Sequence, residues 1–257
     1  MDIAVFCIWG YFFPITLLIC KILFYIMSDI EWFSFENKDL DFPFYKKNPY
    51  VPKWGWIILF IAVMVGLIVA SGESLIFAVI GCAISVIPVL YFLKWDVKAI
   101  FQIPKAKEIA LAVGLFVGYL IYSLILGSFL DMLSVPSATL VEESAVTLEI
   151  FPPLLFTLMV EEFIKFVPFV FFLRLFYKYT DNRKLSVIVS MFLVMVFFAY
   201  LHAVDPKYFL FAFFMQGLGS IFEFIGYIKT KNILISYITH LCTDVFLFLL
   251  IILEVNI

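Results

Sequence analysis

The sequence LMVEEFIKF, residues 158–166, places two glutamates and a lysine inside an apolar run that covers residues 151–176. Charged side chains at membrane depth are costly in free energy, and those that occur there usually serve a function. In a helix, Lys165 lies one turn beyond Glu161 and Glu162, so it can pair with either carboxylate. Because one lysine accounts for only one glutamate, the other remains available as a general base. We therefore expect a functional site at this stretch.

The composition of the chain is that of a polytopic membrane protein. Of its 257 residues, 65% are hydrophobic and only 14% are charged. Runs of about 20 apolar residues predict helices that cross a bilayer. The expected fold is an all-α bundle of about eight transmembrane helices, at residues 3–27, 54–70, 75–93, 109–133, 151–176, 185–203, 208–228 and 233–254. This pattern divides the chain into an N-terminal four-helix region, residues 1–133, and a second four-helix region, residues 151–254, which holds the candidate site.

The distribution of basic residues predicts the orientation in the membrane. Fourteen of the 17 Lys and Arg residues lie in alternate connectors, at residues 38–53, 94–107, 174–184 and 229–231. The connectors on the other side hold only Lys207, and Lys21 and Lys165 lie within predicted spans. Since Lys and Arg favour the cytoplasmic side, we expect an integral protein of the cell membrane with both termini outside.

The only two histidines of the chain supply candidate partners for the glutamates. His202 ends the sixth predicted span, and His240 lies one helical turn before Asp244 on the eighth. A local hydrogen bond between His240 and Asp244 is the simpler structural interpretation of that pair. Glu223 lies on the seventh predicted span. The sequence does not decide whether it has a structural role or contacts the substrate. No HExxH helix and no basic aromatic surface for nucleic acid occurs, although two histidines with acids also fit zinc, which commonly takes three protein ligands.

Taken together, three stretches resemble the CPBP family of intramembrane proteases, which includes the type II CAAX prenyl endopeptidases and the bacteriocin-processing or self-immunity (Abi) proteins. That family shows a glutamate pair, then FxxxH, then HxxxN or HxxxD. The corresponding residues here are Glu161 with Glu162, Phe198 with His202, and His240 with Asp244. The resemblance covers about residues 151–250.

The first motif departs from the usual EExxxR of the family. Position 166 is Phe, and Lys165 supplies the positive charge one residue earlier. The resulting EExxK also resembles the PrsW-type proteases, whereas the other two stretches fit the CPBP pattern better. Asp244 replaces the commoner Asn, and an ionised carboxylate cannot donate a hydrogen bond, so an oxyanion role would require a protonated Asp244.

The resemblance implies hydrolysis of a peptide bond within the bilayer, without a metal cofactor and with zinc as the alternative. Glu161 and His202 would activate a water molecule, Glu162 with Lys165 would fix the helix face, and His240 beside Asp244 would stabilise the oxyanion. The substrate would be a membrane-associated peptide, or a lipidated or membrane-anchored protein in contact with membrane lipid.

One geometric difficulty accompanies this interpretation. Glu161 lies ten residues, about 15 Å, inside its predicted span, whereas His202 lies near the outer end of its own span. Helix tilt or a different span boundary has to reconcile the two. Two other functions stay open: a catalytically silent immunity or regulatory protein of the same fold, and a proton-coupled transporter of small solutes, for which buried Glu, His and Lys are equally suitable. The absence of a clear sequence repeat argues mildly against a transporter.

Overall fold

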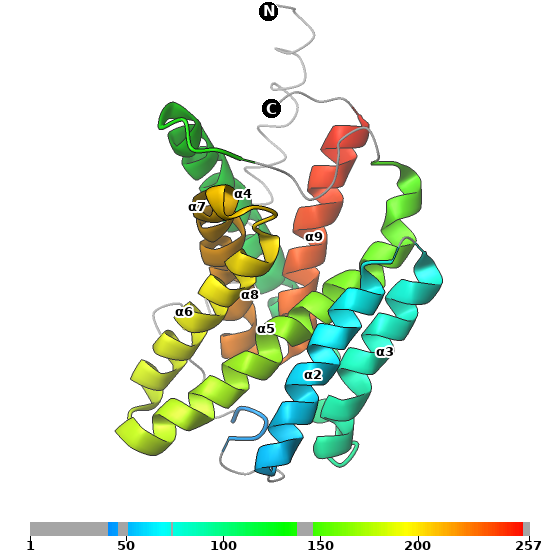
Figure 1. Cartoon of the computed structure of the whole chain (residues 1–257), viewed down its shortest axis with the longest axis vertical. Coiled ribbons are helices and arrows are strands. Elements are labelled where there is room, and N and C mark those ends of the chain that lie inside the picture. Colours follow the sequence, from blue (N-terminus) through cyan, green and yellow to red (C-terminus); the bar gives the residue numbers. More distant parts are fainter. Residues whose placement is uncertain (1–40, 46–50, 73, 138–145, 254–257) are drawn as a thin grey trace, which may run out of the picture.

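The computed structural model describes residues 41–45, 51–72, 74–137 and 146–253. The first predicted span, at residues 3–27, lies outside these ranges. Within them the chain is helical and contains no β-strand. The main helices are α2 (Lys53–Ala70), α3 (Leu75–Phe92), α4 (Ala106–Met132), α5 (Phe151–Thr180), α6 (Arg183–His202), α8 (Ile221–Thr230) and α9 (Ile233–Ile252), arranged as one bundle (Figure 1).

Six helical segments are long and apolar enough to cross a membrane. They are α2, α3, α4, α6, the segment Pro206–Thr230 and α9. The 30-residue α5 is longer than any of these, but Glu161, Glu162 and Lys165 lower its apolar content. The expected all-helical membrane protein is therefore confirmed in its class. The prediction of eight spans also counts α5 and the range 3–27. Because that range lies outside the described residues, the number eight stays a prediction.

Helix α5 forms the centre of the bundle and crosses it diagonally (Figure 1). It packs against α2, α3, α6 and α9. All residues from Glu162 to Val170 are buried, so this part of the helix has no face toward solvent or lipid. A helix that is covered on every side lies in a protein core. Its central position carries the charged stretch of residues 158–166 to the interior.

Helices α2 and α3 form a tightly packed antiparallel pair on one flank of α5 (Figure 1). The closest approach is at Gly66 and Gly81, where a Cβ atom added to Gly81 would lie 2.5 Å from the carbonyl oxygen of Gly66. Small residues permit such contacts between membrane helices, where packing rather than hydrophobic burial drives association.

The hairpins α5–α6 and α8–α9 turn through related sequences, Thr180-Asp181-Asn182 and Thr230-Lys231-Asn232. The middle residue is left-handed in both, with φ of 48° and 55°. In each turn the Thr hydroxyl donates to the carbonyl four residues earlier and accepts the backbone N–H of the Asn, at 3.3 and 3.2 Å. Each Asn side chain then caps the next helix, at the backbone N–H groups of Leu185 and Leu234. Both turns thus fix a short antiparallel connection.

The seventh predicted span is an interrupted helix rather than a regular one. It passes through the 3₁₀ turn η4 (Pro206–Tyr208), α7 (Phe209–Ala212), the π-helical turn η5 (Phe213–Gly217) and the 3₁₀ turn η6 (Leu218–Ser220) before α8 begins. The hydroxyl of Tyr122 on α4 donates to the carbonyl oxygen of Phe214 at 2.6 Å. Such bonds satisfy backbone groups that irregular helices leave open at membrane depth.

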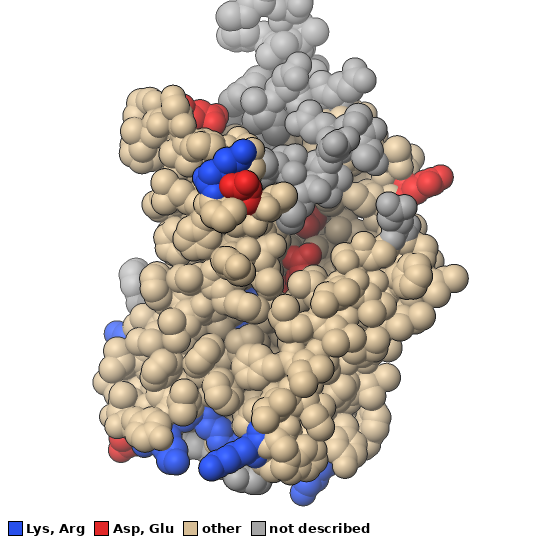
Figure 2. All heavy atoms as spheres, in the orientation of Figure 1, with Lys and Arg blue, Asp and Glu red and all other residues tan. Residues whose placement is uncertain are grey.

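Charged side chains are unevenly distributed over the surface. On the face shown in Figure 2, basic side chains gather at the lower end of the bundle, while acidic side chains are visible in a hollow nearer its centre. The lower end is where α5 meets α6, as Figure 1 shows. The candidate site belongs to the upper half of the bundle.

Candidate functional site

The site forms where α5, α6, α8 and α9 meet, and the hairpin turns explain how its residues reach the same depth. Glu161 lies 20 residues before Asp181, and His202 lies 20 residues after Asn182. Two antiparallel helices that rise equally from one turn bring such residues to the same height, about 30 Å from the turn. Glu161 and His202 therefore lie at the same depth, although one is far from the outer end of its helix and the other is close to it. The reason is that α5 extends beyond α6 at the outer end.

The outer half of the site consists of Glu161, His202 and Asp244, with the Nε2 atom of His240 beside them. The Oε2 atom of Glu161 lies 3.9 Å from Nε2 of His202 and 3.8 Å from Nε2 of His240. Asp244 Oδ2 lies 3.8 Å from the same Nε2 of His240. The side chains of Glu161, His202 and Asp244 are 17–26% exposed. These separations exceed direct hydrogen bonds and match groups that share a water molecule.

His202 is oriented by its own helix through the FxxxH spacing. Its Nδ1 atom lies 2.9 Å from the carbonyl oxygen of Phe198, which can only accept, so Nδ1 carries the hydrogen. The two rings are also in contact, with centroids 4.3 Å apart. In a neutral ring Nε2 is then a hydrogen-bond acceptor, and it faces Glu161. The spacing thus selects the tautomer as well as the direction of the ring.

The inner half of the site consists of Glu162, Lys165 and Glu223, whose side chains are 3–10% exposed. The ammonium group of Lys165 lies 2.6 Å from Glu162 Oε1 and is hydrogen-bonded to Glu223 Oε2. It also lies 4.9 Å from the ring centroid of Phe198, a cation–π distance. Ion pairing of this kind is what makes buried carboxylates tolerable in an apolar interior.

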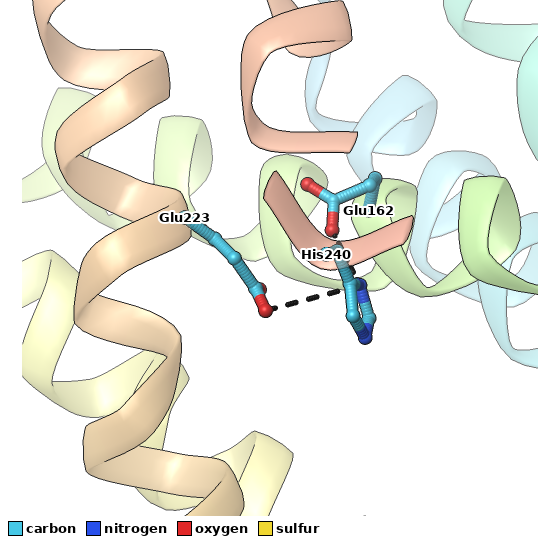
Figure 3. A group of neighbouring side chains, drawn as sticks. All are labelled: Glu162, Glu223 and His240. Atoms are coloured by element: carbon cyan, nitrogen blue, oxygen red, sulfur yellow. Dashed lines mark hydrogen bonds and ion pairs between the residues drawn. The ribbon is translucent and has the colours of Figure 1, made fainter. Parts of the chain in front are cut away.

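His240 connects the two halves through its two ring nitrogens. Nδ1 lies 2.9 Å from Glu162 Oε1 and 3.9 Å from Glu223 Oε1. Figure 3 shows how the three side chains lie. A carboxylate accepts, so Nδ1 donates to Glu162, and Nε2 faces the outer half. The expected local hydrogen bond between His240 and Asp244 is not made directly, since the two side chains are 3.8 Å apart. Nε2 can donate to an oxyanion only as part of an imidazolium ring.

A small cavity adjoins the inner half. It has room for about one water molecule and is lined in part by Glu162, Glu223, Tyr227 and Ser236. The hydroxyl oxygen of Tyr227 is buried and has no partner among the described residues. The lining of the cavity is mostly apolar, so the cavity offers few polar partners to a water molecule.

The donor set for a metal is present but does not suit one. Glu162, Glu223 and His240 offer ligand atoms that all lie within 4.8 Å of one another. The ammonium of Lys165, however, already contacts both carboxylates and lies 3.4 Å from His240 Nδ1. A divalent cation would need the same carboxylate oxygens and would be repelled by this ammonium. These three residues therefore do not fit a metal ion while Lys165 stands between them.

The structure brings the residues singled out in the sequence to one place. Glu161 faces both histidines, while Glu162 takes the ion pair with Lys165. The spacing alone had left open which glutamate the lysine would choose. Glu223 is the residue whose role the sequence did not assign, and the available signal was an acid within an apolar span. Comparisons with known proteins add nothing to this geometry, since no family model, curated protein or solved structure matches the chain.

Proposed function

We propose that this protein is an intramembrane endopeptidase that hydrolyses peptide bonds with water activated by a glutamate and a histidine. The observation that carries the proposal is the position of the Glu161 carboxylate, between the Nε2 atoms of His202 and His240 at 3.9 and 3.8 Å. Glu161 and His202 are partly exposed, whereas His240 is buried. A carboxylate and an unprotonated imidazole nitrogen at this spacing are suited to bind and deprotonate one water molecule.

The first chemical step follows from this arrangement. A water molecule donates one hydrogen bond to Glu161 and the other to Nε2 of His202. Its oxygen attacks the carbonyl carbon of the substrate while one proton passes to Glu161. The C–N bond then breaks as Glu161 returns this proton to the leaving nitrogen. The second proton of the water passes from the new carboxylic acid to His202 and then to solvent, so Glu161 ends the cycle ionised.

The tetrahedral intermediate carries a negative charge, which His240 is placed to stabilise. Its Nε2 is on the side of Glu161 and Asp244, and its Nδ1–H is held by Glu162. A hydrogen on Nε2 requires the imidazolium form, and the carboxylates of Glu161, Glu162, Glu223 and Asp244 lie within 4 Å of its ring nitrogens. Asp244 then supports the imidazolium as an anion and needs no proton of its own for this role.

The class of protease follows from the resemblance to the CPBP family, together with the meeting of its three motifs at one site. With α5 and the range 3–27 counted as spans, the chain crosses the membrane eight times, with the basic connectors inside and both termini outside. The site would then open toward the outer side. A membrane-associated peptide, or a lipidated or membrane-anchored protein, is the substrate class that can reach such a site.

The test compares newly formed protein termini in membranes of cells that produce the wild type, Glu161→Gln or His202→Gln. We expect cells with the wild type to contain new termini that cells without the protein lack. In both variants the amount of these termini should be lower by about 100-fold or more, as loss of a general acid or base predicts. The control is Glu149→Gln, because Glu149 is an exposed acid at the outer end of α5, outside the site. Equal cleavage in all four samples, or no cleavage that depends on the wild type, would reject a protease.

A further inference from the structure

Glu223 belongs to none of the three motifs, yet it reaches the site from a fourth helix. It lies eight residues before Lys231, and His240 lies eight residues after Asn232, so the α8–α9 turn brings both to the same height. In Figure 3 the side chain of Glu223 extends from its helix toward His240. Its Oε1 atom lies 3.9 Å from His240 Nδ1, and its Oε2 atom is hydrogen-bonded to Lys165.

The position of Lys165 creates a competition that involves His240. The ammonium lies 3.4 Å from His240 Nδ1, close enough to become a donor to that nitrogen if the nitrogen lost its hydrogen. Glu162 Oε1 is shared, since it accepts from Lys165 at 2.6 Å and from His240 Nδ1 at 2.9 Å. A lysine with only one carboxylate partner would therefore compete with His240 for that oxygen and would itself offer Nδ1 a hydrogen bond.

We propose that Glu223 is a positioning residue: by accepting a hydrogen bond from Lys165, it leaves the Nδ1–H of His240 to Glu162 and keeps Nε2 directed at Glu161 and Asp244. The effect on peptide hydrolysis rests on the proposed function, whereas the effect on the ring of His240 does not. Without Glu223, Lys165 donates to Nδ1, the imidazolium gives up its hydrogen on Nδ1 and becomes a neutral ring with hydrogen on Nε2 alone, and Glu162 loses its bond to the ring.

The test uses the whole chain, labelled with ¹⁵N-histidine in detergent micelles. His240 and His202 are the only histidines, so a His202→Gln background leaves the signals of one ring. Nitrogens with and without hydrogen resonate in separate ranges. With Glu223 intact we expect Nδ1 of His240 to carry hydrogen. In Glu223→Met we expect the ratio of rings with hydrogen on Nδ1 to rings without it to decrease about 10-fold to 100-fold, as loss of a hydrogen bond to a charged group predicts.

Two further variants separate positioning from simple structural support. Glu223→Gln keeps an acceptor for Lys165 and should retain the hydrogen on Nδ1. The double variant Glu223→Met with Lys165→Met removes the competing donor together with the acceptor, and it should restore hydrogen on Nδ1. It also replaces a buried ion pair by apolar side chains, a change that proteins often tolerate. If Glu223→Met does not fold, the double variant and Glu223→Gln still test the prediction through the same nitrogen.

Two results would overturn the proposal: an Nδ1 without hydrogen when Glu223 is intact, or an Nδ1 that keeps its hydrogen in folded Glu223→Met. Loss of hydrogen from Nδ1 in the double variant or in Glu223→Gln would also contradict it. None of these readouts requires cleavage of a peptide, so a failed protease assay leaves them valid. If the protein does cleave peptides, Glu223→Met in the His202-containing chain should reduce the rate about 10-fold to 100-fold, with recovery in the double variant.

Discussion

At the scale of single residues, the site depends on which cation stands between Glu162 and Glu223. The ammonium of Lys165 contacts both carboxylates. It belongs to a side chain of α5, so unlike a metal ion it cannot dissociate from the site. An ammonium has three donors and no acceptor, so it bridges the two carboxylates through hydrogen bonds and offers no open coordination position at which a carbonyl oxygen could bind as it would to a metal ion. In the proposed mechanism the chemistry is then left to Glu161 and the two histidines.

A metal assay tests this arrangement directly. We expect the purified wild type to retain much less than one zinc ion per chain after dialysis, measured by elemental mass spectrometry, because the ammonium of Lys165 opposes a second cation. We expect Lys165→Met to bind zinc more tightly, since Glu162, Glu223 and His240 then offer three ligand atoms within 4.8 Å of one another. Stoichiometric zinc in the wild type that is lost in His240→Ala would contradict the assignment and support a metallopeptidase.

At the scale of helices, the sequence predicted where elements lie better than how they meet. Apolar runs marked the ranges of α2 to α6 and α9 within a few residues, because the bilayer sets a minimum length. The π-helical turn in the range 213–217 was not predictable, since it depends on packing against neighbouring helices. The common depth of Glu161 and His202 was also missed. The two residues lie equally far along the chain from the Asp181–Asn182 turn. Depth measured from the outer ends of the helices misses this, because α5 is longer than α6.

The two related turns allow a matched comparison. Asn232 is buried, caps Leu234, accepts from the backbone N–H of Gln102 at 3.1 Å and donates to the carbonyl of Gln102 at 2.8 Å. Asn182 occupies the equivalent position but is exposed and caps only its own helix. We expect Asn182→Ala to lower the free energy of unfolding by about 1 kcal/mol, and Asn232→Ala by about 2–4 kcal/mol, because the latter also leaves backbone groups of Gln102 unsatisfied.

Denaturant titration in detergent micelles, followed by circular dichroism, measures both changes. Equal losses for Asn182→Ala and Asn232→Ala would show that the contact with Gln102 contributes nothing. A larger loss for Asn232→Ala would identify the α8–α9 turn as an anchor between the connector at residues 93–105 and the hairpin that carries Glu223 and His240. That anchor lies at the lower end of the bundle and outside the site.

At the scale of the whole molecule, the structure separates a basic end from a polar site nearer the opposite end (Figure 2). The α5–α6 and α8–α9 turns, with Arg183 and Lys231, belong to the basic end. The positive-inside rule predicts that this end lies in the cytoplasm. In the proposed orientation the site with Glu161, His202 and Asp244 would face outward, so substrates would enter from the outer side or laterally from the outer leaflet.

Cysteine labelling in intact cells tests this orientation. In a chain whose four natural cysteines are replaced by alanine, single cysteines would be placed at the exposed positions Glu149 and Lys207 on one side, and Lys98 and Lys184 on the other. We expect a membrane-impermeant maleimide to label the first two in intact cells, and the second two only after permeabilisation. Because each position lies in a different connector, the pattern also checks the alternation of spans. Labelling of Lys184→Cys in intact cells would show that the orientation is the reverse and that the site faces the cytoplasm. Labelling of Glu149→Cys and Lys184→Cys from the same side would show that α5 does not cross the membrane.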